Sequence, residues 1–136
     1  MQSKKVKIDW AENDRITLEN ILTIALDSNF SSVMLTRAAD GYPIEYVNPA
    51  FTDLTGYAPD EVIGKGPGLL QGPKTDRDLL NLLREKLDSG DTFHGKTVNY
   101  RKDGTEFMME WKIYPISNSD NKTTHFLAVQ RSAHQN

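Results

Sequence analysis

The sequence predicts an α+β fold in which helices cover one face of a five-stranded antiparallel sheet. After an N-terminal helical pattern come two β-rich runs, then a second helical stretch, and three more β-rich runs near the end of the chain. The turn sequences "KDG" and "NSDNK" separate the last three runs, which favours an antiparallel meander. A sheet of five strands can place its first hairpin beside its last strand and bury one face under the helices. The length of 136 residues is typical of one such domain.

An amphipathic helix is expected near the start of the chain, over residues 15–28. Asp14 precedes it and can cap its first turn. Its apolar residues recur at helical spacing and form one stripe, made of Leu18, Ile21, Leu22 and Ala25. The lysines that come before this helix are interpreted as part of a solvated arm.

A hairpin is expected next, over residues 31–48. Two short β-rich runs flank the sequence "AADGYP", which has Asp-Gly at its centre. Residues 49–64 then mix short helical patterns with Gly56 and Pro59, which predicts one or two short helices instead of a long one. Pro59 suits the first turn of the second helix.

The strongest helical pattern has Thr75 or Asp76 as its N-terminal cap and Gly90 as its stop. Leucine recurs through it at positions 79, 80, 82, 83 and 87. Residues 64–77, which lead into this helix, are expected to form a loop. Strands are expected after the helix over residues 92–101, 106–116 and 124–131.

The composition excludes several classes of function. The chain has no cysteine, which rules out disulfides, thiolate nucleophiles and cysteine-based zinc sites. A net charge of -3 gives no reason to expect nucleic acid as a partner. No apolar run could span a bilayer and no signal peptide is visible, so we expect a cytoplasmic protein with no membrane partner. The histidines and carboxylates show no spacing typical of a metal or catalytic site, so we do not expect an enzyme.

Five motifs spread through the chain occur in a specific order. They are "YVNPAFTDLTGY", "DEVIGK", "LLQGPKTDR", "NYRKDGTEF" and "FLAVQR". Together they resemble a PAS domain, and more narrowly its light-oxygen-voltage (LOV) flavin-binding branch. The resemblance covers residues 30–132, with an N-terminal arm and cap helix at residues 1–29 and a tail at residues 133–136. It implies the PAS fold, in which a small ligand sits in the cleft between the sheet and the helices.

The segment "GKGPGLLQ", residues 64–71, aligns without a gap to a LOV pattern that resembles G-x-N-C-R-F-L-Q. The asparagine, cysteine and arginine of the family are replaced here by Gly66, Pro67 and Gly68. The photochemistry of the family needs a thiol sulfur that bonds to the flavin ring, and Pro67 has none. Gly68 also lacks the guanidinium group that would bind a flavin phosphate. The resemblance therefore implies a domain without thiol-flavin adduct photochemistry.

Four other positions match cofactor contacts of the family. Gln71, Asn99 and Gln130 match amide side chains that contact the flavin, and Arg84 matches a second arginine that binds its phosphate. These matches imply FMN or FAD as the candidate cofactor. Two other interpretations stay open. The amides can pair with each other, or brace loops, inside a ligand-free core, and Arg84 can form an ion pair with a helix neighbour such as Asp88, four residues later.

Two departures from the family weigh against a flavin. Met109 stands where the family usually carries a second asparagine, and Trp111 lies two residues later on the same face of the strand. Methionine cannot donate a hydrogen bond to a flavin carbonyl, and an inward indole would take space that the ring system needs. Together these two side chains could close the pocket, which is one hypothesis for this site. The alternative is that both side chains pack against helices like ordinary strand residues.

The function implied by the resemblance is that of a sensory and signalling module. Such a domain relays a change in its cleft, or in its dimer interface, to an attached effector domain or a partner protein. We expect a homodimer formed through the N-terminal helix and the sheet. One alternative is a cysteine-less redox or light sensor that binds FMN or FAD. A third hypothesis, of a different class, is a small flavin-dependent oxidoreductase.

Overall fold

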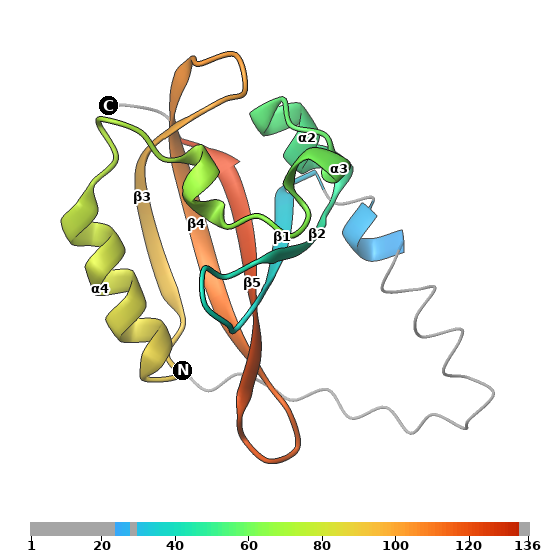
Figure 1. Cartoon of the computed structure of the whole chain (residues 1–136), viewed down its shortest axis with the longest axis vertical. Helices are drawn as coiled ribbons and strands as arrows, with labels where there is room; N and C mark the ends of the chain where they lie inside the picture. Colours follow the sequence, from blue (N-terminus) through green and yellow to red (C-terminus); the bar gives the residue numbers. More distant parts are fainter. Residues whose placement is uncertain (1–23, 28–29, 134–136) are drawn as a thin grey trace.

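The computed structural model of the chain describes residues 24–27 and 30–133 (Figure 1). These residues include one five-stranded antiparallel sheet with the strand order β2-β1-β5-β4-β3. The strands are β1 (Ser32–Arg37), β2 (Ile44–Val47), β3 (Phe93–Tyr100), β4 (Glu106–Ser117) and β5 (Thr123–Ser132). The predicted α+β fold is confirmed, and so is the place of the first hairpin beside the last strand. The helix expected over residues 15–28 lies outside the described residues except for 24–27, which are helical.

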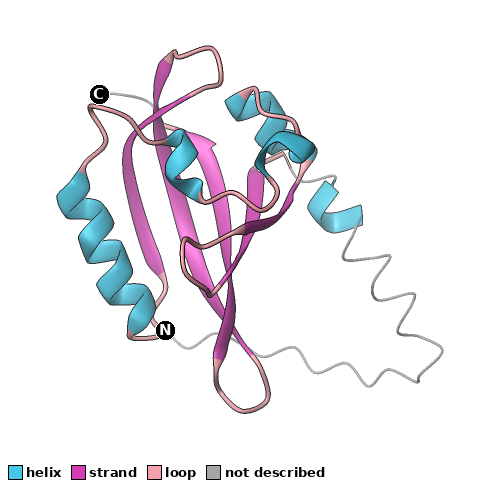
Figure 2. Cartoon of the chain, viewed as in Figure 1, coloured by secondary structure: helices cyan, strands magenta, loops and turns pink. Residues whose placement is uncertain are grey.

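All the helices between β2 and β3 contribute to the same core (Figure 2). They are α2 (Pro49–Thr55), α3 (Pro59–Val62), the 3-10 helix η2 (Pro67–Leu70) and α4 (Arg77–Asp88). Proline stands in the first turn of α2, α3 and η2, where its missing N–H would have no helical partner. At the start of α4, the Asp76 carboxylate accepts a hydrogen bond of 3.0 Å from the Leu79 amide, as the predicted cap requires.

The helix η2 differs from the expectation of a loop. It is one tight turn in which the Gln71 amide donates to the Gly68 carbonyl at 3.0 Å. A turn of this length has too few residues to show a helical period in the sequence, which is why the pattern indicates only a loop.

The inner face of the sheet is apolar. In one row across the sheet, Met34 of β1 pairs with Ala128 of β5, Ala128 pairs with Ile113 of β4, and Ile113 pairs with Phe93 of β3. All four side chains are buried in the core. Because side chains alternate along a strand, the residues next to them face the opposite side.

The outer face of the sheet carries a second, more exposed row. Leu35 pairs with Leu127, and Leu127 pairs with Tyr114. Leu35 and Leu127 are half-buried, and Tyr114 is 38% exposed. Ile116, two residues further along β4, is 41% exposed. An apolar patch therefore lies on the face of the sheet opposite to the core.

The buried side chain of Asn48 joins α2 to the first strand. Its Oδ1 accepts hydrogen bonds from the amides of Val33 at 2.8 Å and Phe51 at 3.1 Å, so that it also caps α2. Its Nδ2 donates to the carbonyls of Leu26 and Ser31, each at 2.9 Å. All the hydrogen-bonding positions that one amide side chain offers are thus filled.

We expect Asn48→Ala to lower the free energy of unfolding by about 2–4 kcal/mol, because it removes a helix cap and leaves buried backbone groups without a partner. Urea denaturation measures the loss. Asn118→Ala is the matched control, since the Asn118 side chain accepts from Asp120 and Lys122 in an exposed turn. The control is expected to lose less than about 1 kcal/mol. Equal losses for the two variants would contradict this role of Asn48.

Candidate functional site

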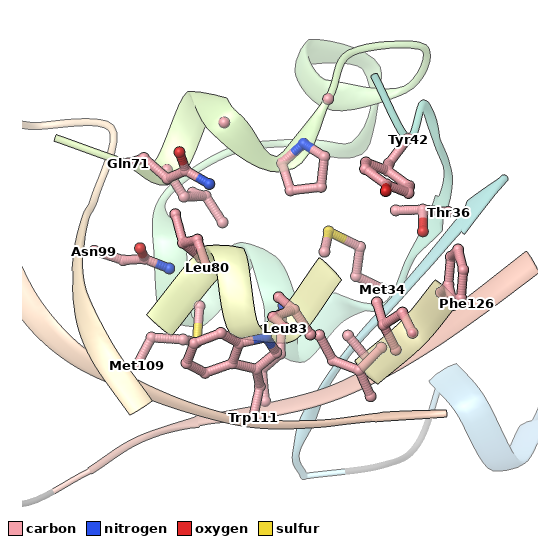
Figure 3. Close-up of a pocket in the computed structure, with 18 of the residues that line it drawn as sticks. Met34, Thr36, Tyr42, Gln71, Leu80, Leu83, Asn99, Met109, Trp111 and Phe126 are labelled. Carbon is pink, nitrogen blue, oxygen red and sulfur yellow. The ribbon is translucent and has the colours of Figure 1, made fainter. Parts of the chain in front are cut away.

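A cavity of about 750 Å³ lies between the inner face of the sheet, α4, η2 and the turn of the first hairpin (Figure 3). Its volume is within the range of roughly 300–1,000 Å³ that is usual for small-molecule and cofactor sites. All seven residues singled out from the sequence line it: Pro67, Gln71, Arg84, Asn99, Met109, Trp111 and Gln130. The structure thus brings the whole predicted set to one place, although their contact with a ligand remains a prediction.

Met109 and Trp111 lie along the floor of the cavity and do not close it (Figure 3). Both side chains are buried against the sheet, with exposed fractions of 1% and 7%. The Trp111 indole packs beside the Phe93 ring, with a distance of 6.4 Å between the ring centroids. The hypothesis that these two residues close the pocket is therefore wrong. Both side chains pack into the core against the sheet, and the space above them remains open.

The three amide side chains do not pair with one another. Gln71 Oε1 accepts a hydrogen bond of 2.6 Å from Arg77 Nη1, and Gln130 Oε1 accepts one of 3.0 Å from Ser32 Oγ. Within residues 24–27 and 30–133, the side chain of Asn99 has no hydrogen-bond partner. It lies at the same end of the cavity as Gln71 (Figure 3). The alternative of mutual pairing is therefore not found, whereas Gln71 and Gln130 each hold a neighbouring segment, as the alternative of loop bracing predicts.

The Arg77 hydrogen bond orients the Gln71 amide. A guanidinium group has only donors, so it holds the amide oxygen of Gln71 and leaves the amide NH₂ group for other partners. The cavity at this end is therefore able to offer N–H donors to a ligand that carries carbonyl oxygens or ring nitrogens.

Arg84 lines the cavity from α4 and is exposed. No ion pair between described residues includes it, so the alternative of an Arg84 pair with Asp88 is not found there. The guanidinium group of Arg84 is thus free to meet an anionic group at the cavity.

The Gly-Pro-Gly segment of residues 66–68 has a packing role that sequence alone does not reveal. A Cβ atom added at Gly66 would lie 2.4 Å from the carbonyl oxygen of Gly41, in the turn of the first hairpin. A Cβ atom at Gly68 would meet nothing within 4 Å. Gly66 therefore allows a close approach of two loops at the edge of the cavity, whereas Gly68 borders open space.

Several lining residues are missing from the sequence-based set. Thr36 and Met34 come from β1, and Leu80 and Leu83 come from α4. Leu80 stands four residues before Arg84, on the same helical face, so the spacing could have indicated it. Thr36 could not be placed, because its contact with the cavity depends on the pairing of β1 with β5.

The carboxylates whose pKa is lowered lie outside the cavity. The pKa of Glu110 is lowered below 4.5 by hydrogen bonds to His94 and Arg131. That of Glu45 is lowered by its hydrogen bond to Arg37, and His125 adds to the effect. These groups form ion pairs at the surface, with distances between 2.6 and 2.8 Å. They provide no acid-base pair facing the cavity.

Among residues 24–27 and 30–133, no three histidine, aspartate or glutamate side chains come close enough to hold a metal ion. In the same residues, no helix is both long and apolar enough to cross a membrane.

Comparison with known proteins agrees with the fold. A family model described as "PAS domain" matches residues 31–133. A blue-light photoreceptor of Listeria innocua is 38% identical over 113 residues, which are 82% of this chain and 44% of that protein. Several plant and haloarchaeal relatives are longer still, and the chain spans 10% to 23% of their length.

Two solved structures resemble the whole domain. An RNA-binding light-oxygen-voltage receptor has a TM-score of 0.82 and 29% identity, and the match covers 93% of this chain and 37% of that one. A light-oxygen-voltage domain studied with a flavin analogue has a TM-score of 0.76 and 28% identity, with coverage of 90% and 89%.

We expect Gly66→Ala to lower the free energy of unfolding by about 1–3 kcal/mol, because the added methyl group forces η2 away from the hairpin turn. Gly68→Ala is the matched control and is expected to change stability by no more than about 0.5 kcal/mol. Chemical denaturation of both variants measures the difference. The close approach at Gly66 is refuted if both variants are as stable as the unaltered chain.

Proposed function

The chain belongs to the PAS domain family, with relatives and structural neighbours of the LOV type, and from this premise we propose that it is a sensory signalling module that binds a flavin without forming a thiol adduct. The observation that carries the proposal is the open cavity lined by three amide side chains. Because the chain has no cysteine, no side-chain thiol can bond to the ring.

The cavity residues fit a flavin in both volume and chemistry. A flavin has an apolar aromatic body with carbonyl oxygens and ring nitrogens at one edge. The walls formed by Met34, Trp111 and Phe126 match the body. The amides of Asn99 and Gln71 lie together at one end, where they match the polar edge. An unpartnered amide such as Asn99 is costly to bury unless a ligand or water satisfies it, which supports a polar ligand at this end.

A bound flavin supplies absorption of blue light and reversible reduction. Without a thiol, the protein can respond only through the groups that contact the ring. Gln130 is the contact with a direct route out of the cavity. It is 4% exposed, and its Oε1 accepts from Ser32 Oγ at 3.0 Å. A change in the hydrogen bonds of Gln130 would therefore alter the first residue of β1.

Asn48 extends this route to the N-terminal segment. Val33, which follows Ser32, donates its amide to Asn48, and Asn48 in turn holds the carbonyls of Ser31 and Leu26. Ligand state is thus coupled to Leu26 and Ser31 through hydrogen bonds and the peptide link between Ser32 and Val33. This arrangement supports the relay of a change in the cavity to flanking segments, and from there to an effector domain or a partner protein.

The outer face of the sheet supports a second copy of the chain as a partner. It presents the half-buried pair Leu35 and Leu127 beside the more exposed Tyr114 and Ile116. The N-terminal helix predicted over residues 15–28 has an apolar stripe that could cover such a patch in its own or a neighbouring chain. The expectation that nucleic acid is not a partner stays a prediction, since one similar solved structure is an RNA-binding receptor.

An oxidoreductase is less well supported than a sensor. The ion pairs that lower the pKa of Glu45 and Glu110 lie outside the cavity, so they offer no proton donor or acceptor there. Nothing among the lining residues indicates chemistry on a second substrate. We therefore propose a binding and signalling role and no enzymatic activity.

We expect the purified chain to bind FMN and FAD with one-to-one stoichiometry, seen as a structured visible absorption band that survives gel filtration. Asn99→Leu should weaken binding by about fivefold, because leucine has a similar size but cannot make the hydrogen bonds of the amide. Lys96→Ala, on the same strand but exposed, is the control and should bind normally. A colourless protein that ignores FMN and FAD would rule out the flavin part of the proposal.

We also expect the chain to have twice the monomer mass in solution. Leu22→Glu places a charge on the predicted apolar stripe and should shift the mass to that of a monomer. Asn20→Glu, off the stripe of the same predicted helix, should leave the dimer intact. Light scattering coupled to gel filtration measures all three masses. A monomer in every case would end the dimer proposal.

A further inference from the structure

We infer that this cavity holds a flavin by its ring and gains little from a terminal phosphate, so that riboflavin and FMN bind with nearly equal affinity. The inference rests on the proposed flavin site and adds to it the class of flavin that the site accepts. It follows from the charges and side chains at the opening of the cavity.

The opening is identified by the lining residues that are exposed. These are Gly41 in the hairpin turn, Gly68 in η2 and Arg84 in α4. Every other lining residue is buried or half-buried. A ligand whose ring lies against the sheet would therefore direct its tail outward between η2 and α4.

Side chains at this opening offer one positive charge. Gly41 and Gly68 have no side chain, and Pro67, the first residue of η2, has no donor. Among the lining residues, Arg84 alone is cationic. The closed interior walls of the site hold no further cation that could reach a phosphate.

Neighbouring cations are engaged elsewhere. Arg77 donates to Gln71 at 2.6 Å, and Lys74 lies 3.1 Å from the Glu106 carboxylate. Lys65, next to Gly66, is not a lining residue. Recruiting any of these to a phosphate would break an existing interaction or require a move into the opening.

The strength of the contact between Arg84 and the phosphate sets how far FMN is preferred over riboflavin. A single exposed guanidinium is screened by water and salt, and an exposed ion pair changes an equilibrium by no more than about fivefold. The ring, in contrast, is surrounded by apolar walls and three amides. The phosphate of FMN should therefore add at most about fivefold to an affinity that riboflavin already has.

The test compares riboflavin and FMN by parallel titration of the flavin-free chain, followed by quenching of flavin fluorescence. We expect dissociation constants within about fivefold of each other in moderate salt. In Arg84→Gln, the small preference for FMN should disappear while riboflavin affinity stays the same. Arg84 is exposed, so this variant is expected to fold normally.

A gain-of-function variant makes the comparison sharper. Gly68 has room for a side chain, since a Cβ atom there meets nothing within 4 Å. Gly68→Arg supplies a second exposed guanidinium at the opening and should strengthen FMN binding by up to about fivefold with little effect on riboflavin. Gly68→Gln, of similar length without charge, should favour neither flavin.

The outcomes separate the inference from the proposed function. An FMN preference of about thirtyfold or more in the unaltered chain, removed by Arg84→Gln, would overturn the inference and leave the flavin site standing. A chain that binds neither flavin would overturn the flavin site and the inference together. If Gly68→Arg strengthened the binding of riboflavin and FMN equally, this would also contradict the inference. The gain would then not come from attraction between the added charge and the phosphate.

Discussion

The pairing of β1 with β5 is the constraint on which the cavity depends. These strands lie far apart in the chain, yet they pair in unbroken register from Ser32 opposite Gln130 to Arg37 opposite His125. The pairing joins the N-terminal hairpin to the C-terminal meander and makes one sheet from two pieces. Closing so long a loop costs conformational entropy, and the buried apolar row of Met34, Ala128 and Ile113 offsets it.

The same pairing connects the cavity to the start of the domain. It brings Ser32 beside Gln130, so that a lining residue is hydrogen-bonded to the residue where the ordered strand begins. A slip of one residue would turn both side chains to the opposite face, since strand residues alternate. The register and the hydrogen bond therefore depend on each other, and the proposed route of communication depends on both. Asn48 adds stability to this arrangement by holding the segment that precedes β1.

Glycine has two different roles around the opening of the cavity. At Gly66 it lets the η2 segment lie close to the Gly41 carbonyl, and a larger residue would separate the two loops. At Gly68 it leaves space that nothing fills. The LOV branch carries functional side chains at the matching positions. This chain has lost their chemistry at both glycines, but only Gly66 takes part in close packing.

Polar groups in the core follow a simple rule. Within the described residues, no fully buried side-chain nitrogen or oxygen lacks a hydrogen-bond partner. Asn48 and Gln130 meet this rule with partners from the protein. Asn99 does not have such a partner, and it lines open space instead of packed core. This contrast agrees with the proposed role of Asn99 as a ligand contact, because buried amides in proteins are otherwise hydrogen-bonded.

Local elements of the fold could be predicted from the sequence because local chemistry controls them. The Asp76 cap, the proline at the start of α3 and the Asp-Gly hairpin turn all depend on residues near them in the chain. The family motifs extended the prediction to the strand order and to the positions of Gln71, Asn99 and Gln130 in the lining of the cavity. The helix η2 was missed because one turn has no measurable period.

The sequence by itself determined that no thiol chemistry is available, that the domain has an α+β architecture, and that Met109 and Trp111 share one face of their strand. Only the tertiary structure decided that the cavity is open above Met109 and Trp111, since free volume depends on how side chains pack across the sheet and helices. It also decided the partners of the amides, because Arg77 and Ser32 meet Gln71 and Gln130 only after the chain has folded. Residue identity limits what each side chain can do, whereas contacts between distant segments set what it does.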